Sequence, residues 1–347
     1  MISRLTDTLA RVGRPASLWT SPDGSRVLVL PYGGRILGLF TALSDRNFFW
    51  TNPALDNSET AEAYYHGPQW HNSGGERTWL SPEVEFFLPD YPSLKTYFQP
   101  REFDPGSYEL ESRRDEWILR NSFTARMARS KSTVRLRINK GIAPAKDPLT
   151  NAEANLSSSL QYAGFTLRTG LEILENTASA QLNLWSLLQL PHGGTMILPT
   201  YGHAQVIHFM GSISSDDLQV SNSIVRYKMH DAGEHKIGVP ALFATGRIGY
   251  LLLNGDASTL VVRNIIINPS AKYLDTPWTA QDSVGAAIEV CSVNSDLGAF
   301  SELEHHAPAI GGAGGNTECE DISQVWAYRG SEDAIRSAAR ILLHPSL

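Results

Sequence analysis

The segment from His66 to Glu83 brings together residue types that can carry out chemistry. It reads His-Gly-Pro-Gln-Trp-His-Asn-Ser-Gly-Gly-Glu-Arg-Thr-Trp-Leu-Ser-Pro-Glu. Histidine titrates near neutral pH, polar side chains hydrogen-bond hydroxyl groups, and tryptophan offers a flat apolar face. A sugar ring, with apolar faces and a hydroxylated edge, matches this mixture. Because apolar residues are sparse before Leu80, we expect a loop here, not a core strand or helix; the alternative interpretation is a glycine-rich surface loop held by buried indoles.

A second unusual segment is Phe300-Ser-Glu-Leu-Glu-His-His-Ala-Pro-Ala309. On an extended strand, Glu302 and Glu304 lie on one face and Leu303 on the other. Two carboxylates that lie close together repel each other, which can raise the pKa of one into the range of a general base. The alternative interpretation is a solvated edge strand with ordinary acidic residues.

Several acidic and histidine residues are of types that bind Zn²⁺ or a similar metal ion: His66, His71, Glu302, Glu304, His305 and His306. None of the known ligand-spacing motifs is present, and His305 and His306 should face opposite sides of a strand. We therefore predict no metal and no cofactor. A nucleophile elbow, a Walker loop and a dinucleotide fingerprint in a strand–helix context are also absent from the sequence.

Two further histidines follow or flank strand-like segments. His192, in Leu190-Pro-His-Gly-Gly-Thr195, comes directly after a strong strand and is a candidate proton donor. A surface histidine in a turn is an equally good interpretation. The segment Ala232-Gly-Glu-His-Lys-Ile-Gly238 has another histidine beside a lysine, and it could equally be a solvated turn.

The composition is that of a globular protein. The chain has 347 residues, 42% of them hydrophobic, and a net charge of -7. No basic stretch suggests nucleic acid or an anionic membrane as a partner, and no run approaches the roughly 18 apolar residues of a membrane span. Cys291 and Cys319 are expected to be free thiols, although one bridge is possible. With no signal-peptide pattern at Met1, we expect a cytoplasmic protein.

Helices are expected only near the two ends of the chain. Ile2, Leu5, Leu9 and Val12 recur at helical spacing and stop at Gly13. Near the other end, Ser331 can cap a helix from about Glu332 to Leu342. Ile335, Ala338, Ala339 and Leu342 would form its apolar face.

The intervening sequence favours a long series of strands. Residues 26–31 and 35–41 flank Tyr-Gly-Gly and predict a hairpin. Residues 51–85 are expected to form a loop, and residues 143–158 an irregular excursion. A series of strands without intervening helices favours an antiparallel sandwich or barrel in one domain, residues 1–347. The later expected strands are 117–125, 133–139, 160–174, 181–190, 204–209, 223–229, 248–254, 259–267, 285–293 and 299–304.

Taken together, these segments resemble the galactose mutarotase-like superfamily, which contains the aldose 1-epimerases. The resemblance implies an all-β supersandwich of two large antiparallel sheets, with its core at about residues 25–330. The Gly-Gly-Glu-Arg-Thr-Trp block is its most specific part. The matching segments are Tyr32-Gly-Gly-Arg-Ile36, Phe49-Trp-Thr-Asn-Pro53, Asn72 to Glu83, Asn183-Leu-Trp-Ser-Leu-Leu-Gln189 and Ser301-Glu-Leu-Glu304.

The resemblance implies an enzyme that interconverts the α and β anomers of a free sugar. In that family a glutamate removes the anomeric hydroxyl proton and a histidine protonates the ring oxygen. Glu302 or Glu304 is the implied base. The segment that usually carries the histidine reads Trp185-Ser-Leu-Leu-Gln189 and has none, so His192, His71 or His66 would replace it. Arg77 matches the substrate-binding arginine, and the other expected substrate-binding residues are His66, Trp79, Gln189, Glu76 and Asn72.

Two alternatives to an epimerase remain open. One is a carbohydrate-binding protein that keeps the cleft without the acid. The other is a sugar lyase or hydrolase, possibly metal-assisted, that uses the histidines. In each case the expected partner is a small sugar or an oligosaccharide, and neither nucleic acid nor a membrane. The sequence leaves the oligomeric state open.

Overall fold

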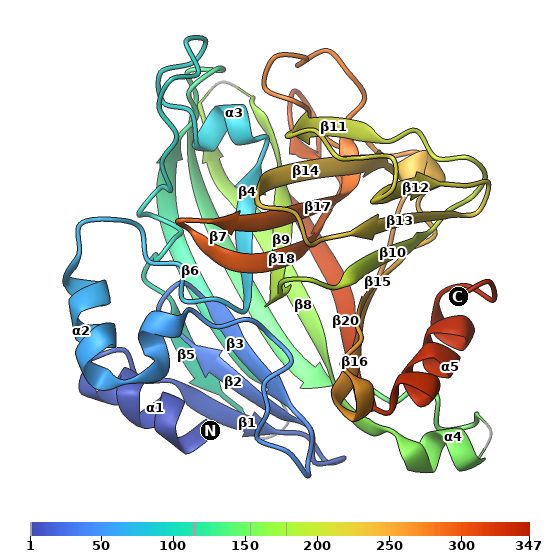
Figure 1. The fold of residues 1–347 in the computed structure, drawn as a ribbon. Coiled ribbons are helices and arrows are strands. Elements are labelled where there is room, and N and C mark those ends of the chain that lie inside the picture. Colours follow the sequence, from blue (N-terminus) through green and yellow to red (C-terminus); the bar gives the residue numbers. More distant parts are fainter. Residues whose placement is uncertain (1, 114–115, 153, 178) are drawn as a thin grey trace.

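The computed structural model describes residues 2–113, 116–152, 154–177 and 179–347. Its described strands form two ten-stranded antiparallel sheets that pack on a shared core (Figure 1). This confirms the predicted supersandwich. In the first sheet the strands run, in order, β1 (Ser17–Thr20), β2 (Arg26–Leu30), β3 (Arg35–Phe40), β4 (Glu76–Ser81), β9 (Gln181–Pro191), β18 (Gly298–His306), β17 (Ala286–Ser295), β14 (Gly233–Pro240) and β11 (Ile207–Met210), with β19 (Ile310–Gly311) paired to β9.

The second sheet contains the longest strands. Its order is β12 (Leu218–Val220), β13 (Ile224–Lys228), β10 (Thr195–Pro199), β15 (Arg247–Leu252), β16 (Ser258–Ile265), β20 (Glu318–Gly330), β8 (Gln161–Asn176), β7 (Thr133–Pro144), β6 (Trp117–Arg126) and β5 (Glu109–Ser112). The remaining helices are α2 (Ser58–His66), α3 (Glu83–Phe86) and α4 (Ala154–Ser159), with the 3-10 turns η1 (Pro53–Asp56), η2 (Ala241–Phe243) and η3 (Gly255–Ala257).

The predicted hairpin is present as β2 and β3, and its two faces have different neighbours. Val27 and Val29 belong to the core between the sheets. Leu28 and Leu30 point the other way and pack with Leu9 of α1 (Ile2–Arg11). Successive side chains of a strand point to opposite faces of the sheet, so the valines and the leucines contact different neighbours. Helices α1 and α2 therefore cover the outer face of this end of the sheet (Figure 1).

Helix α5 (Glu332–Leu342) begins and ends where the sequence predicts. The Ser331 side chain accepts a hydrogen bond from the backbone amide of Ala334, as an N-cap residue does. The predicted apolar face, from Ile335 to Leu342, packs on Leu260 and Tyr328 of the second sheet. Burial of this face fixes the helix on the outer side of β16 and β20.

Removal of this cap tests the capping interaction. Ser331→Ala is expected to lower the free energy of unfolding by about 1 kcal/mol, because an amide at the helix start loses its acceptor. Chemical denaturation measures this change. Ser337→Ala is the matched control in the middle of the same helix, where alanine is the better helix former and no loss is expected. Equal effects of the two substitutions would contradict the capping role.

The loop predicted over residues 51–85 is wrong in part. This segment contains α2 and the strand β4, whose six residues are all buried. The strand lies between β3 and β9 and is covered on both faces. Its polar side chains are therefore buried and interact with partners in the protein instead of with solvent. Glu76, for example, accepts a hydrogen bond from Lys140 of β7 at 2.7 Å. Burial of such polar groups requires partners that sequence patterning does not reveal.

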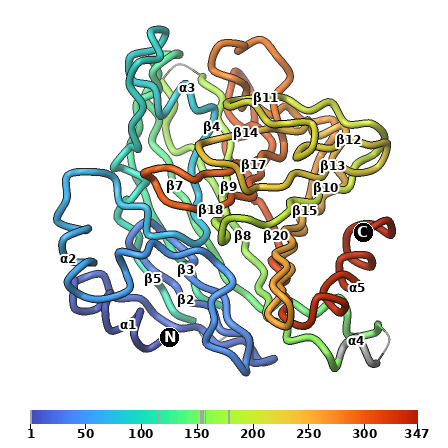
Figure 2. Tube along the Cα trace, in the orientation of Figure 1, coloured from blue at the N-terminus to red at the C-terminus, as the bar shows by residue number. Residues whose placement is uncertain are grey.

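The tube view brings two distant segments to the same end of the molecule (Figure 2). The segment at α3 and the orange segment after β16 meet there. The backbone amide of Glu83 donates to Asp275 at 2.8 Å, and the Trp278 indole donates to Glu83 at 2.7 Å. Both cysteines, Cys291 and Cys319, are free, as predicted. None of the helices in the described residues is long and apolar enough to cross a membrane.

Candidate functional site

A cavity of about 440 Å³ lies on the face of the first sheet that points away from the second sheet. Along β4, Arg77 and Trp79 line this cavity, which we call the cleft, whereas Glu76 points to Lys140 in the other sheet. Strands β9, β14, β17 and β18 extend its floor. The lining residues are Trp70, Asn72, Arg77, Trp79, Glu83, Tyr97, Gln99, Trp185, Leu187, Met210, Glu234, Lys236, Trp278, Cys291, Val293, Leu297, Phe300, Glu302 and Glu304.

A buried ion pair marks one end of the cleft. Arg77 Nη1 lies 2.9 Å from Glu302 Oε1, and both side chains are less than a tenth exposed. The guanidinium also lies 4.1 Å above the ring centre of Trp79 and 5.3 Å from that of Trp70. Such stacking on aromatic faces suits guanidinium groups and fixes their orientation. Arg77 is thus held rigidly between a carboxylate and two indoles.

The other end of the cleft is organised around Lys236 of β14. Its Nζ atom lies 2.7 Å from Glu289, 3.5 Å from Glu304 and 3.9 Å from Glu83. The ammonium also lies 4.3 Å from the ring centre of Trp185. Burial alone would lower the pKa of Lys236, but the surrounding carboxylates together raise it well above its ordinary value. Lys236 is therefore an ammonium group at neutral pH.

Glu304 has the most perturbed carboxyl group of the cleft lining. Burial raises its pKa well above the ordinary value; Lys236 opposes this shift, and the neighbouring charges of Glu302 and Glu289 reinforce it. The Trp185 indole donates a hydrogen bond to Glu304 Oε2 at 2.8 Å. The sequence correctly predicts that Glu302 and Glu304 share a face, because both line the cleft while Leu303 belongs to the core between the sheets.

Further buried acids lie behind Lys236. Burial raises the pKa of Asp275, and the charges of Glu289 and Glu83 raise it further. Burial also raises the pKa of Glu289, while Lys236 and a hydrogen bond with Asp275 lower it. His306 Nε2 lies 3.3 Å from Glu289 Oε2, and burial lowers the pKa of His306 to about 4. His305 points to the opposite side and lies 2.8 Å from Asp321 of β20. The predicted opposite orientation of these two histidines is confirmed.

Aromatic side chains form the walls of the cleft. Tyr97 and Trp278 stack with ring centres 5.6 Å apart and an interplanar angle of 20°. Glu83 accepts hydrogen bonds from the Tyr97 hydroxyl at 3.2 Å and from the Trp278 indole at 2.7 Å. Near Arg77, Trp70 and Trp79 have ring centres 5.4 Å apart. These walls present the flat apolar surfaces that a sugar ring can pack against.

Several buried polar atoms near Arg77 have no hydrogen-bond partner within the protein. They include both side-chain heteroatoms of the Asn72 and Gln189 amides and the Arg77 Nε atom. Gln189 is fully buried and lies directly across from Glu302 in the pairing of β9 with β18. An unpaired buried polar group costs about 1–3 kcal/mol, so a ligand that supplied partners would be favoured here.

Most of the sequence-predicted residues come together in the structure. Arg77, Trp79, Asn72, Glu302 and Glu304 all line the cleft. Gln189 lies on β9 with the lining residues Trp185 and Leu187, and every second side chain of a strand points to the same face, so Gln189 shares their face. Their roles stay predictions, but their proximity to one another is a property of the fold.

The predicted histidines are not brought to the cleft. Neither His71, His192 nor His66 is among the described lining residues. His71 packs among tyrosines, and its Nδ1 lies 2.7 Å from the Tyr32 hydroxyl. His192 Nε2 lies 3.2 Å from the Ser292 hydroxyl, and His66 is exposed at the end of α2. Burial lowers the pKa of His71 and of His192.

Glu76 is also placed away from the cleft. It forms a fully buried ion pair with Lys140 and accepts a hydrogen bond from the Ser186 hydroxyl at 3.1 Å. Neighbouring side chains on a strand point to opposite faces, so Arg77 in the cleft requires Glu76 to face the second sheet. The structure therefore assigns Glu76 to the packing between the sheets.

Sequence reasoning missed Lys236, Glu83, Trp185 and Trp278 as cleft residues. The interpretation of residues 232–238 as a turn is wrong, because β14 is a strand that buries Lys236. The available signal was the apolar run Ile237-Gly-Val-Pro240 directly after the lysine, which is typical of a buried strand. No sequence signal joins Trp278, on a loop about 200 residues later, to Glu83.

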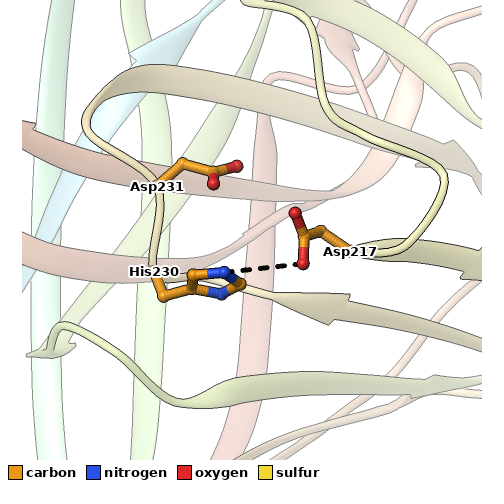
Figure 3. Close-up of side chains that lie close together, drawn as sticks. All are labelled: Asp217, His230 and Asp231. Carbon is orange, nitrogen blue, oxygen red and sulfur yellow. Dashed lines mark ion pairs between the residues drawn. The ribbon is translucent and has the colours of Figure 1, made fainter.

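Three groups of described residues have the types and proximity of metal ligands. Asp275, Glu289 and His306 form the first group, in which Glu289 is already paired with the Lys236 ammonium. Cys291, Glu302 and Glu304 form a second. The third is Asp217, His230 and Asp231, where His230 Nε2 lies 3.6 Å from Asp217 (Figure 3). His230 is half exposed, and this group lies outside the cleft lining. The absence of a metal stays a prediction.

Comparisons with solved structures show related folds at low sequence identity. A galactose mutarotase-like protein from Lactobacillus casei ATCC 334 has a TM-score of 0.50 at 8% identity, covering 90% of this chain and 99% of that chain. A galactose mutarotase related enzyme from Lactobacillus acidophilus gives 0.50 at 10% identity, covering 92% and 98%. The Slr1438 protein from Synechocystis sp. PCC 6803 gives 0.51 at 8% identity, covering 92% and 96%.

The sequence comparisons identify a family. No curated protein matches the chain. The family described as "Family of unknown function (DUF6786)" matches residues 5–347, nearly the whole sequence. The chain therefore belongs to this family, DUF6786, and its fold is that of the galactose mutarotase-like proteins.

Proposed function

We propose that this protein binds a free sugar in the cleft and interconverts its anomers, as an aldose 1-epimerase-like isomerase. The observation that carries this proposal is the row of Arg77, Glu302 and Glu304 on the floor of an aromatic-walled cleft. The names of the Lactobacillus structures with the same fold support it.

Binding follows from the chemistry of the walls and of the unpaired polar atoms. A pyranose ring can pack its apolar face on Trp278, which is only partly buried, and gain hydrophobic contact area. Its hydroxyl groups can then pair with the Asn72 amide and Arg77 Nε, which have no protein partner. This combination favours a hydroxylated ring over an apolar ligand, since an apolar ligand would leave these atoms unpaired.

Anomer exchange requires two proton transfers. A base removes the proton of the anomeric hydroxyl, and an acid protonates the ring oxygen as the ring opens. Glu302 and Glu304 lie in the cleft and are of the right type for the base. Since the described cleft lining contains no histidine, the acid on this proposal is a residue other than the predicted His71, His192 or His66.

The charge of the cleft predicts which sugars bind. Arg77 and Lys236 are already paired with the protein's own carboxylates, and Glu83, Glu234, Glu302 and Glu304 line the same space. We expect neutral hexoses or pentoses to bind at least about 10-fold more tightly than the corresponding uronates or sugar phosphates, because like charges repel in a site of low dielectric. Tighter binding of the anionic sugars would contradict this prediction.

Tryptophan fluorescence measures this selectivity, because Trp70, Trp79, Trp185 and Trp278 all line the cleft. The titration uses glucose, galactose and xylose beside glucuronate and glucose 6-phosphate. Anomer exchange of each sugar that binds is then followed by NMR saturation transfer, against the rate in buffer. Exchange above that rate supports the isomerase, and binding of none of the sugars overturns the proposal.

A second candidate function is carbohydrate binding without catalysis. The observation that favours it is that the described cleft lining contains no histidine. The resemblance to the aldose 1-epimerases implies a histidine as the catalytic acid. The same experiment separates the two functions. Saturable binding with exchange at the buffer rate would support the binding protein over the isomerase.

A further inference from the structure

We propose that Glu302 and Glu304 act together, Glu302 as the base and Glu304 as the acid, so that one strand supplies both proton-transfer groups. This inference rests on the proposed function and names the residue that takes the place of the histidine acid. Both groups lie on β18, two residues apart, and both side chains line the cleft.

The spacing of the two carboxyl groups suits this reaction. One oxygen of Glu302 and one of Glu304 lie within 4.8 Å of each other. In a pyranose, the anomeric hydroxyl oxygen and the ring oxygen are bonded to the same carbon. Two carboxyl oxygens at this separation, on one side of the sugar, can therefore each come within hydrogen-bond reach, about 2.6–3.2 Å, of one sugar oxygen.

The surroundings of Glu302 and Glu304 differ in a way that suits a base and an acid. Glu302 forms an ion pair with Arg77 at 2.9 Å, so a cation lies directly beside the proposed base. Glu304 is more deeply buried, at 1% exposed against 5% for Glu302. Burial and the charges of Glu302 and Glu289 raise the pKa of Glu304, which favours the protonated form that an acid needs.

The groups around Glu304 come from three other strands, from helix α3 and from the loop after β16. Lys236 approaches from β14 at 3.5 Å, and the Trp185 indole donates from β9. Glu289 pairs directly across from Glu304 on β17, and the Cys291 thiol of that strand lies in the same cluster as Glu302 and Glu304. Glu83 and Asp275 reach the same ammonium at 3.9 and 4.0 Å. Lys236 is the only cation among these described groups.

The proton transfers balance over one cycle. The Glu302 carboxylate takes the proton of the anomeric hydroxyl, the bond between the anomeric carbon and the ring oxygen breaks, and Glu304 gives its proton to that oxygen. The aldehyde then rotates about its bond to the neighbouring carbon. In the reverse direction the Glu304 carboxylate takes the proton back, the ring closes on the other aldehyde face, and Glu302 returns its proton to the new anomeric oxygen.

Lys236 is a positioning residue in this cycle. When Glu304 has given up its proton, its carboxylate lies 3.5 Å from the ammonium and keeps the Trp185 hydrogen bond. Opposite charge at this distance stabilises the anion that forms as the ring opens. Lys236 thus lowers the free energy of the ring-opened intermediate without exchanging a proton.

The first test compares Glu304→Gln and Glu302→Gln with the wild-type protein. Each substitution keeps the shape of the side chain and removes one proton-transfer group, so anomer exchange should fall at least about 100-fold. Sugar binding, followed by tryptophan fluorescence, should change much less. Glu318→Gln, on an exposed position of β20 away from the cleft, is the control that should leave exchange unchanged.

The second test is the pH profile of exchange. Exchange should fall as the pH rises through the pKa of Glu304, since the acid form is lost. Lys236→Met and Trp185→Phe each remove an interaction that lowers this pKa, so each should shift the alkaline limb to higher pH. Trp185→Phe also serves as the milder variant if Lys236→Met does not fold.

Three results would overturn the assignment of Glu302 as base and Glu304 as acid. Exchange by Glu304→Gln at the wild-type rate shows that Glu304 is not the acid, while the proposed function stands. An alkaline limb that stays at the wild-type pH in Trp185→Phe and Lys236→Met has the same meaning. If the wild-type protein accelerates exchange of no sugar, the proposed isomerase fails, and the pairing fails with it.

Discussion

Replacing Lys140 by methionine is expected to lower the free energy of unfolding by about 3–5 kcal/mol, the usual effect of removing one partner of a buried ion pair. Lys140 Nζ lies 2.7 Å from Glu76 Oε2, and both side chains are fully buried between the two sheets. The same ammonium donates to the carbonyl oxygen of Gly34 at 2.7 Å. Methionine fills a similar volume but leaves the Glu76 carboxylate without its direct ion-pair partner. Chemical denaturation measures the loss of stability.

Two controls isolate the effect of burial in this prediction. Arg135 and Glu175 form an ion pair with the same 2.7 Å separation, but both side chains are at least half exposed. Arg135→Met should therefore change the stability by less than about 1 kcal/mol. In the double variant Lys140→Met with Glu76→Gln, neither member of the pair is charged, and most of the lost stability should return. A loss in Lys140→Met no larger than in Arg135→Met would contradict the structural role of this pair.

Replacing Arg77 by methionine is expected to weaken sugar binding by about 10- to 100-fold, the usual effect of losing a hydrogen bond from a charged group. Arg77 lies over Trp79 and holds Glu302 at 2.9 Å, so the substitution removes a ligand-facing donor and frees the carboxylate. Anomer exchange should fall further than binding, because Glu302 also loses the ion pair that holds its carboxylate in the cleft. Fluorescence titration and saturation transfer measure the two effects separately.

The matched control for this variant is Arg329→Met. Arg329 is also buried and lies 4.4 Å above the ring centre of Phe48, but it is not among the residues that line the cleft. Its loss should leave sugar affinity unchanged. Equal affinities of wild-type and Arg77→Met proteins, with the folded state verified by thermal unfolding, would contradict a role for Arg77 in binding.

Local sequence patterns were sufficient to predict most of the strands and the shared face of Glu302 and Glu304. These features depend on short-range periodicity, such as the apolar alternation along β6 and the capping of α5 by Ser331. The predicted hairpin at Gly33 and Gly34 depends on glycine in the same way, since both have positive φ values, 85° and 58°.

The features that the sequence could not reveal depend on contacts between distant segments. β4 was not predicted because its buried polar residues obtain partners from β7 and β18. From the sequence alone, Lys236 looks like a surface lysine. Its burial depends on Glu289 of β17 and Glu304 of β18, which pair with its ammonium group in the folded protein. A histidine close in sequence to a strand end or to Arg77 is a candidate acid, but neither its type nor its position in the sequence indicates on which side of a sheet the side chain lies.

Saturation transfer between sugar anomers, in wild-type and Glu302→Gln proteins side by side, is the most direct test of catalysis in the cleft. We predict exchange well above the buffer rate for at least one neutral sugar with the wild-type protein. Glu302→Gln should bind that sugar and return exchange to near the buffer rate. Equal acceleration by both proteins, or acceleration by neither, would contradict the account.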